Sequence, residues 1–349
     1  QAAELIASDE IDILIDLHGL SSGTRPGIFA LHPAPQQGAY LGFIGPTGMP
    51  WLDFVIADKW ALPEELTPYF TEKPLYVEGS FLPMVSYIDT ERVFTREDVG
   101  LSPDAFVMGA FSNTYKITPK MFDTWMRLLD KIPDSVLWLI DDNSESTENL
   151  KAHALTLGVG PERFVFSPRV GHLDFCARLK LADVYLDTYP YNCGSTSNDV
   201  IHAGVPMVTM YGKTFVSRMG LSLMTSLNSA SHATRNYDEY VDKVIHLSIK
   251  KREGALPILI PHREPVGVGK ALEQLVAQKI PKLKTQAPSS SNSSNVELFQ
   301  ICHTQESLKE VSKGFVALDN SDNSRSVWDD FLSIKNYLTS HSLQDDVFY

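Results

Sequence analysis

Cysteine is scarce in this chain of 349 residues, which contains only Cys176, Cys193 and Cys302. None of them belongs to a CxxC pair or to another spacing typical of metal ligation. So small and odd a number indicates a reducing compartment and excludes a disulfide framework. The sequence also lacks an apolar run of transmembrane length, and its N-terminus shows no features of a signal peptide. We therefore expect a cytoplasmic protein with no membrane partner.

Positive charge is in deficit as well, because 30 Lys and Arg residues stand against 43 Asp and Glu residues, giving a formal net charge of −13 at pH 7. This balance argues against nucleic acid or an anionic membrane surface as the main partner. Neither a Walker loop nor a GxGxxG fingerprint is present, which disfavours an NAD-dependent oxidoreductase. The apolar content of 43% is normal and, at this length, sufficient for the cores of about two domains.

Short apolar runs alternate with helical patterns over residues 106–210. This alternation predicts an α/β fold with a parallel, doubly wound sheet, in which ligands bind beyond the carboxyl ends of the strands. The predicted strands are Phe106–Phe111, Val136–Ile140, Phe164–Phe166, Ala182–Leu186 and Pro206–Met210, and the predicted helices are Pro119–Lys131, Ser146–Leu157, Leu173–Lys180, Ser217–Ser226, Tyr237–Leu247 and Lys270–Gln278.

The loop after Leu186 is rich in small polar residues, in the stretch LDTYPYNCGSTSNDVIHAGVPMVTM. Gly194, Ser195 and Thr196 offer N–H groups and hydroxyls just before a helix that we expect to begin at Asp199. Such a position favours phosphate, because free N–H groups and the helix dipole both present positive charge. Asp199, expected inside the first turn, could accept hydrogen bonds from ribose hydroxyls. An ordinary βαβ turn with a Ser or Thr cap would give the same pattern.

Two further strand-end loops carry residues with a candidate ligand role. Lys116 precedes a helix whose cap we predict at Thr118, where the helix dipole disfavours a lysine, so neutralisation of a phosphate is one explanation and an exposed surface lysine is the other. His172 and Phe175 could hold a nucleobase by edge hydrogen bonds and stacking. Alternatively, His172 could be a surface or capping histidine and Phe175 a core-facing helix residue. The stretch Asp141-Asp142-Asn143 is interpreted as a solvated loop and not as a DxD metal site.

Several longer motifs resemble one known family, the O-linked GlcNAc transferase/SPINDLY family (glycosyltransferase family 41). They are FSNTYKITPKMFDTWMRLLDKIPDSVLWL, FSPRVGH, ARLKLADVYLDTYPYNCGSTSNDVIHAGVPMVTM, GKTFVSRMGLSLM and, upstream, IDILIDLHGLSSGTRPGIFALHPAPQQGAYLGFIGPTGMPWLDFVIAD. The resemblance implies the GT-B fold, with two Rossmann-like lobes facing a cleft. The first lobe is expected to be incomplete, so that the chain is a fragment, truncated at the N-terminus, of a bacterial-type protein.

The implied organisation has four parts. Residues 1–105 would be a partial N-terminal catalytic lobe and residues 106–283 a C-terminal lobe that binds the donor nucleotide. Residues 284–295 form a Ser/Asn-rich linker, and residues 296–349 a partial segment of an unknown module.

The implied activity is inverting, metal-independent transfer of a sugar, commonly GlcNAc from UDP-GlcNAc, to Ser or Thr hydroxyls of proteins. No cofactor or metal is expected. By resemblance, Lys116 would be catalytic, neutralising the leaving diphosphate. The implied donor-binding residues are Gly42 from the first lobe, Asn113 beside the lysine, Val170, His172, Phe175 and Arg178 around the uracil, Gly194, Ser195 and Thr196 around the diphosphate and sugar, and Asp199 on the ribose.

Two departures from the family leave alternatives open. Many members have His where this chain has Phe175, and a His in the glycine loop where this chain has Cys193-Gly194-Ser195. The alternatives are a glycosyltransferase with another donor or acceptor (GDP-fucose, a UDP-hexose, a glycan or Asn) and a non-catalytic nucleotide-sugar-binding module. His18 is interpreted as a turn histidine, and no catalytic base is assigned.

Overall fold

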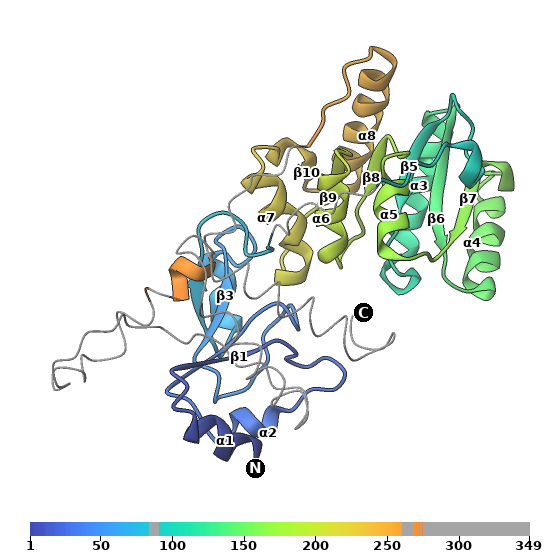
Figure 1. Ribbon diagram of the computed structural model, residues 1–349. Helices are drawn as coiled ribbons and strands as arrows, with labels where there is room; N and C mark the ends of the chain where they lie inside the picture. The colour runs from blue at the N-terminus through green and yellow to red at the C-terminus, as the bar shows by residue number, and fades with distance from the viewer. Residues whose placement is uncertain (84–90, 260–267, 273, 275–349) are drawn as a thin grey trace. The chain divides into compact units, whose positions relative to one another are not determined.

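The computed structural model describes residues 1–83, 91–259, 268–272 and 274 (Figure 1). They belong to two compact units, residues 1–81 with 268–272 and 274, and residues 82–83 with 91–259. The predicted linker, the segment 296–349 and part of the helix predicted over Lys270–Gln278 lie outside the described residues. The lobe boundaries implied by the family resemblance stay a prediction.

The first unit contains a four-stranded, all-parallel sheet in the order β1-β2-β3-β4. Its inner strand β3 has four buried residues, FVIA, as expected of a parallel strand covered on both faces. The elements are α1 (Ala2–Ser8), β1 (Ile13–Asp16), α2 (Pro26–Phe29), β2 (Gln36–Ala39), β3 (Phe54–Ala57), the 3₁₀ helix η1 (Glu64–Tyr69) and β4 (Lys73–Tyr76).

The second unit contains a six-stranded parallel sheet in the order β10-β9-β8-β5-β6-β7, which confirms the predicted doubly wound arrangement. The chain runs outward from β5 to β7, then returns to β8 and continues in the opposite direction. The order of the strands therefore reverses between β5 and β8. The strands are β5 (Phe106–Ala110), β6 (Ser135–Asp141), β7 (Phe164–Pro168), β8 (Val184–Leu186), β9 (Met207–Met210) and β10 (Ala233–Thr234).

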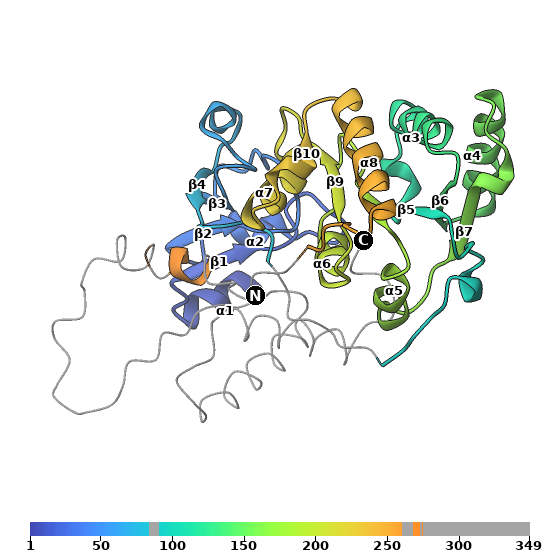
Figure 2. The same ribbon diagram turned by 90° about the horizontal axis from the view of Figure 1, so that it is seen from above.

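Helices cover both faces of this sheet (Figure 2). On one face lie α3 (Pro119–Lys131), α4 (Ser144–Thr156) and α8 (Tyr237–Arg252), and on the other lie α5 (His172–Leu179) and α6 (Ser195–His202). Trp125 of α3 and Tyr240 of α8 are fully buried in the core that these helices form with β5, β6 and β8. The remaining elements are α7 (Met219–Ser226) and the 3₁₀ helices η2 (Glu97–Val99), η3 (Thr114–Lys116), η4 (Pro161–Arg163), η5 (Phe215–Arg218) and η6 (Ala230–His232).

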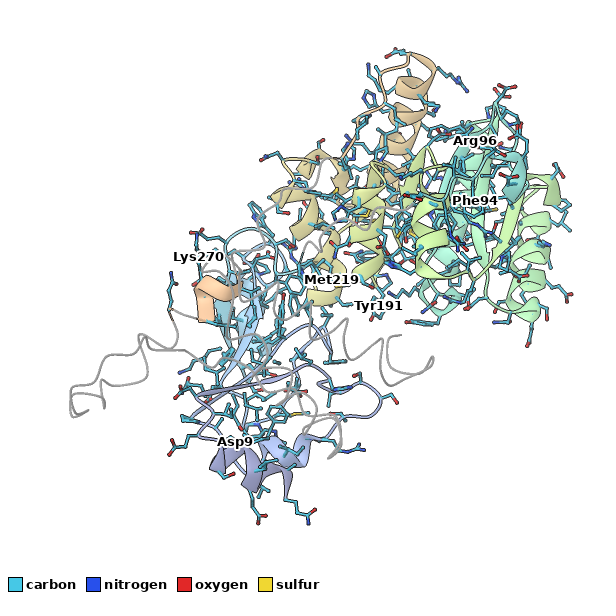
Figure 3. The ribbon with its side chains drawn as sticks, viewed as in Figure 1. Asp9, Phe94, Arg96, Tyr191, Met219 and Lys270 are labelled. Atoms are coloured by element: carbon cyan, nitrogen blue, oxygen red, sulfur yellow. The ribbon has the colours of Figure 1, made fainter. Side chains whose placement is uncertain are left out.

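Arg96, labelled in Figure 3, fixes the segment before β5 to this unit. Its guanidinium donates to the Asp183 carboxylate at 2.8 Å and to the carbonyl oxygens of Ala105 and Leu181 at 2.8 and 3.1 Å. Asp183 also accepts from the Val107 N–H at 2.8 Å and from the Lys251 ammonium at 2.8 Å. Each charge of this buried pair has several partners, so removal of either side chain would leave the other charge incompletely compensated in the interior.

No helix in the described ranges combines the length and the apolar character that a membrane span requires.

Candidate functional site

The predicted ligand-binding residues of the second unit lie at the carboxyl end of its sheet, around the point where the strand order reverses. The loops after β5 and β8 leave neighbouring strands there, on opposite sides of the reversal. Ligands of doubly wound sheets bind at such a switch point. The loop after β7 and the first turn of α5 follow the outermost strand of the same half of the sheet.

Lys116 joins the loops after β5 and β8. It ends η3, and its Nζ lies 3.9 Å from the ring centroid of Tyr191, which Figure 3 labels. The side chain is half-buried, so its interpretation as an exposed surface lysine is wrong. The predicted helix start beyond it is confirmed, because Thr118 Oγ1 accepts from the Met121 N–H at 3.3 Å and Pro119 opens α3. A cation is thus held over an aromatic face.

Asp187 is a fully buried residue directly after β8, and its carboxylate accepts hydrogen bonds from the loop that follows. It accepts from the N–H groups of Thr188 and Cys193 at 2.8 and 2.7 Å, and from the Thr209 hydroxyl at 2.6 Å. Burial raises the pKa of this carboxyl to about 6, although its hydrogen bonds and the positive charge of Lys116 act in the opposite direction. Hydrogen bonds to this buried carboxylate therefore fix the backbone at Thr188 and Cys193, just before Gly194.

The helix expected to begin at Asp199 begins four residues earlier, as α6, with Gly194 as its N-cap. Ser195 and Thr196 occupy its first turn, where we expected a loop. Asp199 lies in the second turn, so its predicted position in the first turn was wrong. The physical reason is that Ser and Thr suit the start of a helix as well as a loop. The backbone N–H groups of Ser195 and Thr196 are the first of α6, and the first N–H groups of an α-helix have no partner within the helix.

His172 and Asp199 join α5 to α6. His172 Nε2 lies 3.0 Å from Asp199 Oδ1, and Cys176 Sγ lies 3.5 Å from the same nitrogen and 3.8 Å from the same oxygen. The hydrogen bond to the Asp199 carboxylate, with a smaller contribution from Cys176, raises the pKa of His172 to about 10. His172 is exposed, as the surface alternative for this residue predicted, but its imidazole pairs with a carboxylate of the neighbouring helix.

Phe175 and Arg178 follow on α5. The Phe175 ring is half-buried and contacts Phe111 edge-to-face, with 5.8 Å between centroids. The Arg178 guanidinium lies 4.9 Å from the Phe94 ring centroid, and its buried Nε has no hydrogen-bond partner among the described residues. Val170, half-buried, lies in the loop just before α5. Phe175 thus forms an aromatic cluster with the end of β5.

Sequence analysis missed a network that joins the loops after β5, β6 and β7. Arg169 donates to Asp142 Oδ1 from Nε at 3.0 Å and from Nη2 at 2.7 Å, and also donates to the amide oxygen of Asn113. The Thr114 hydroxyl donates to the other oxygen of Asp142 at 3.0 Å. Asp142 is therefore half-buried and paired, whereas Asp141 and Asn143 on either side of it are exposed, as the interpretation of this stretch as a solvated loop predicted. The polar strand-end positions were a signal, but their pairing over 27 and 56 residues was not visible in the sequence.

Gly42 belongs to the first unit. A Cβ added at Gly42 would lie 2.1 Å from the Leu17 carbonyl oxygen, so close packing against the end of β1 requires a glycine here. In the turn after β1, His18 is half-buried, and its backbone N–H donates to Asp16 Oδ1 at 2.9 Å. This is the turn position expected for that histidine.

Comparison with known proteins adds independent information. The glycosyl transferase family 41 model matches residues 1–86 and 86–254. The chain is 32% identical over 257 residues to the probable UDP-N-acetylglucosamine–peptide N-acetylglucosaminyltransferase SEC of Arabidopsis thaliana. It is 30% identical over 254 residues to the corresponding SPINDLY protein of Solanum lycopersicum. These matches cover 71% of this chain but only 26% and 27% of the relatives, so the chain spans about a quarter of their length.

Solved structures agree with the fold. An O-GlcNAc transferase mutant of Thermobaculum terrenum matches with a TM-score of 0.64 and 29% identity, over 72% of this chain and 48% of that one. The S. aureus MnaA–UDP co-structure matches with a TM-score of 0.50 over 84% of this chain and 80% of that one, but at 14% identity it supports the fold alone. The fold is of the GT-B type, with parallel α/β sheets in two units, and the chain belongs to glycosyltransferase family 41.

Proposed function

We propose that this protein transfers GlcNAc from UDP-GlcNAc to Ser or Thr hydroxyls of protein acceptors, with inversion and without a metal ion. The observation that carries the proposal is the position of Lys116 in a family-41 chain. Its ammonium lies over the Tyr191 ring, at the point of the sheet where the strand order reverses. The printed names of the relatives, which describe UDP-N-acetylglucosamine–peptide transferases, support this donor and this class of acceptor.

The proposed chemistry assigns a task to each part of the site. When UDP leaves, negative charge builds up on the β-phosphate and must be stabilised without a cation from solution. Lys116 supplies one positive charge, and the first turn of α6, at Ser195 and Thr196, supplies N–H groups, hydroxyls and the helix dipole. Asp187 holds the loop that leads into this helix, so the donors are fixed before the substrate arrives.

Nucleoside recognition is assigned to the helices α5 and α6. Asp199 would accept from the ribose hydroxyls, while Val170 and His172 lie near the uracil edge and Phe175 against its face. The Phe111 ring supports Phe175 from the side, and Arg178 supports the wall behind it. Asn113 would stand beside Lys116, and Gly42 keeps the role in donor binding that the family resemblance implies. The cytoplasmic location and the bacterial origin belong to the same proposal.

The test is isothermal titration of the chain with UDP, UDP-GlcNAc and GDP, with EDTA and again with Mg²⁺. We expect UDP and UDP-GlcNAc to bind more tightly than GDP, with equal affinity in the two buffers. A requirement for Mg²⁺ would refute the metal-independent mechanism, and a preference for GDP would favour the GDP-fucose alternative. A folded chain that binds none of these nucleotides would contradict the donor site.

A further inference from the structure

His172, Cys176 and Asp199 form a cluster whose chemistry the proposed transfer reaction does not use in full. The first two lie one turn apart on α5, and the third comes from α6. One nitrogen, one sulfur and one oxygen atom, each able to bind a metal ion, all lie within 4.8 Å of one another. Cys176 has no part in the proposed recognition of the nucleotide, so the clustering of these three possible metal ligands needs a separate explanation.

The spacing of the three atoms agrees with a tetrahedral zinc ion. Zinc bonds of about 2.0 Å to His, 2.3 Å to Cys and 2.1 Å to a carboxylate place the ligand atoms of a tetrahedron about 3.4–3.6 Å apart. The observed separations are 3.0 Å (N to O), 3.5 Å (N to S) and 3.8 Å (S to O). Shifts of a few tenths of an ångström at side-chain ends would therefore suffice to admit the ion.

The kinds of ligand select the metal. An imidazole nitrogen, a thiolate and a carboxylate together suit a borderline-soft ion, whereas Mg²⁺ and Ca²⁺ prefer sites built of oxygen atoms. A metal ion at this site could exchange with solution, because the His172 side chain is 52% exposed and that of Asp199 is 21% exposed. On binding, zinc would displace the proton between His172 and Asp199 and the proton of the Cys176 thiol, and both protons would pass to solvent.

We propose that His172 Nε2, Cys176 Sγ and Asp199 Oδ1 bind Zn²⁺, with the fourth position open to water, and that zinc and the donor nucleotide exclude each other. The exclusion rests on the proposed function, because Asp199 and His172 are the residues assigned there to the ribose and the uracil edge. A zinc-bound Asp199 oxygen cannot at the same time accept a ribose hydroxyl. Zinc is thus an inhibitor of donor binding and takes no part in the transfer.

The metal site is tested first, on the chelator-treated full chain without nucleotide. Titration with Co²⁺, which takes the place of zinc, should give one equivalent with a thiolate-to-metal charge-transfer absorption. Cys176→Ser should abolish this absorption, while Cys302→Ser, outside the described residues, should leave it unchanged. Absence of the absorption from the wild-type chain, or its persistence in Cys176→Ser, would overturn the site.

The exclusion is tested by titration with UDP in the presence of EDTA and after loading with one equivalent of Zn²⁺. In the wild type, and in Cys302→Ser, zinc should weaken UDP binding by at least about tenfold, the lower end of the effect expected from loss of one charge-assisted hydrogen bond. In Cys176→Ser, which keeps both proposed nucleotide contacts, the UDP affinity should be the same in the two buffers. Equal UDP affinity of the zinc-loaded and zinc-free wild type would overturn the exclusion.

Failure of the two proposals can be told apart. If UDP does not bind to the wild type even in EDTA, the proposed function fails, and the cobalt titration still decides whether the metal site exists. If UDP binds in EDTA but no cobalt absorption appears, only the metal site fails.

Discussion

Replacement of Asp187 by Asn should change the way in which stability depends on pH. The carboxyl is completely buried, and burial raises its pKa from 3.8 to about 6. The folded state therefore holds the proton more tightly than the unfolded state. The resulting stabilisation is fully present below about pH 4 and is lost as the pH rises through about 6.

The magnitude follows from the two pKa values. The difference between 3.8 and about 6, at about 1.4 kcal/mol for each pH unit, corresponds to about 3 kcal/mol of lost stability. The Asp187→Asn variant would have no such loss, because the amide that it introduces is neutral throughout. The amide oxygen can still accept from the N–H groups of Thr188 and Cys193, and the NH₂ group can donate to the Thr209 hydroxyl oxygen.

The assay is urea unfolding of wild type and Asp187→Asn at several values between about pH 4 and pH 8. Because all other carboxyls titrate in both proteins, the difference between the two free energies of unfolding isolates Asp187. We expect this difference to shift in favour of the variant by up to about 3 kcal/mol as the pH rises, and then to level off. A difference that stays flat over this range would show that the hydrogen bonds keep Asp187 ionised and would refute the reasoning. Asp187→Ala should be less stable than both, by about 1–3 kcal/mol for each donor left unpaired.

Three further predictions concern single contacts. Lys116→Ala should weaken UDP binding by about 10- to 150-fold, the equivalent of one charge-assisted contact of about 1.5–3 kcal/mol. Lys120→Ala, which removes a similar lysine 4.6 Å from the Tyr237 ring centroid, should leave UDP binding unchanged in the same titration; equal effects of the two variants would contradict the phosphate role. Arg96→Ala should lower the free energy of unfolding by about 3–5 kcal/mol, because Asp183 would keep a buried charge with fewer partners. Arg127→Ala, which breaks an exposed pair with Asp238, should cost less than about 1 kcal/mol in the same denaturation experiment. Gly42→Ala should lower the thermal midpoint, because its Cβ would lie 2.1 Å from the Leu17 oxygen, whereas Gly27→Ala, with no atom within 4 Å, should not; a stable Gly42→Ala would mean that the turn can move.

Periodicity and turn chemistry predicted the second sheet well. The strands β5 to β9 appear within one or two residues of their predicted limits, and the cap at Thr118 is confirmed. These features depend on neighbours a few residues apart, which a single sequence displays. The start of α6 was misplaced because Ser195 and Thr196 suit both a loop and a first helical turn.

Contacts between distant residues were out of reach of the sequence. Nothing in the spacing of Arg169 and Asp142 indicates that they pair, because β6 and β7 must first be aligned before their loops meet. The HxxxC spacing of His172 and Cys176 is present in the sequence, but Asp199, which completes the cluster, comes 23 residues after Cys176 and from another helix. The structural role of Asp187 could not be predicted from the sequence, because a carboxylate after a strand is more often exposed than buried.

The hydrogen bond from Arg169 to Asn113 fixes the direction in which the Asn113 amide points. An asparagine side chain has a donor end and an acceptor end, and here the guanidinium occupies the acceptor end. The NH₂ group, 3.5 Å from the Tyr115 hydroxyl, is the end left to meet an incoming ligand. Asn113 can therefore favour an oxygen-rich ligand and disfavour one that presents N–H groups, so that an arginine outside the proposed donor contacts sets the polarity of a residue within them.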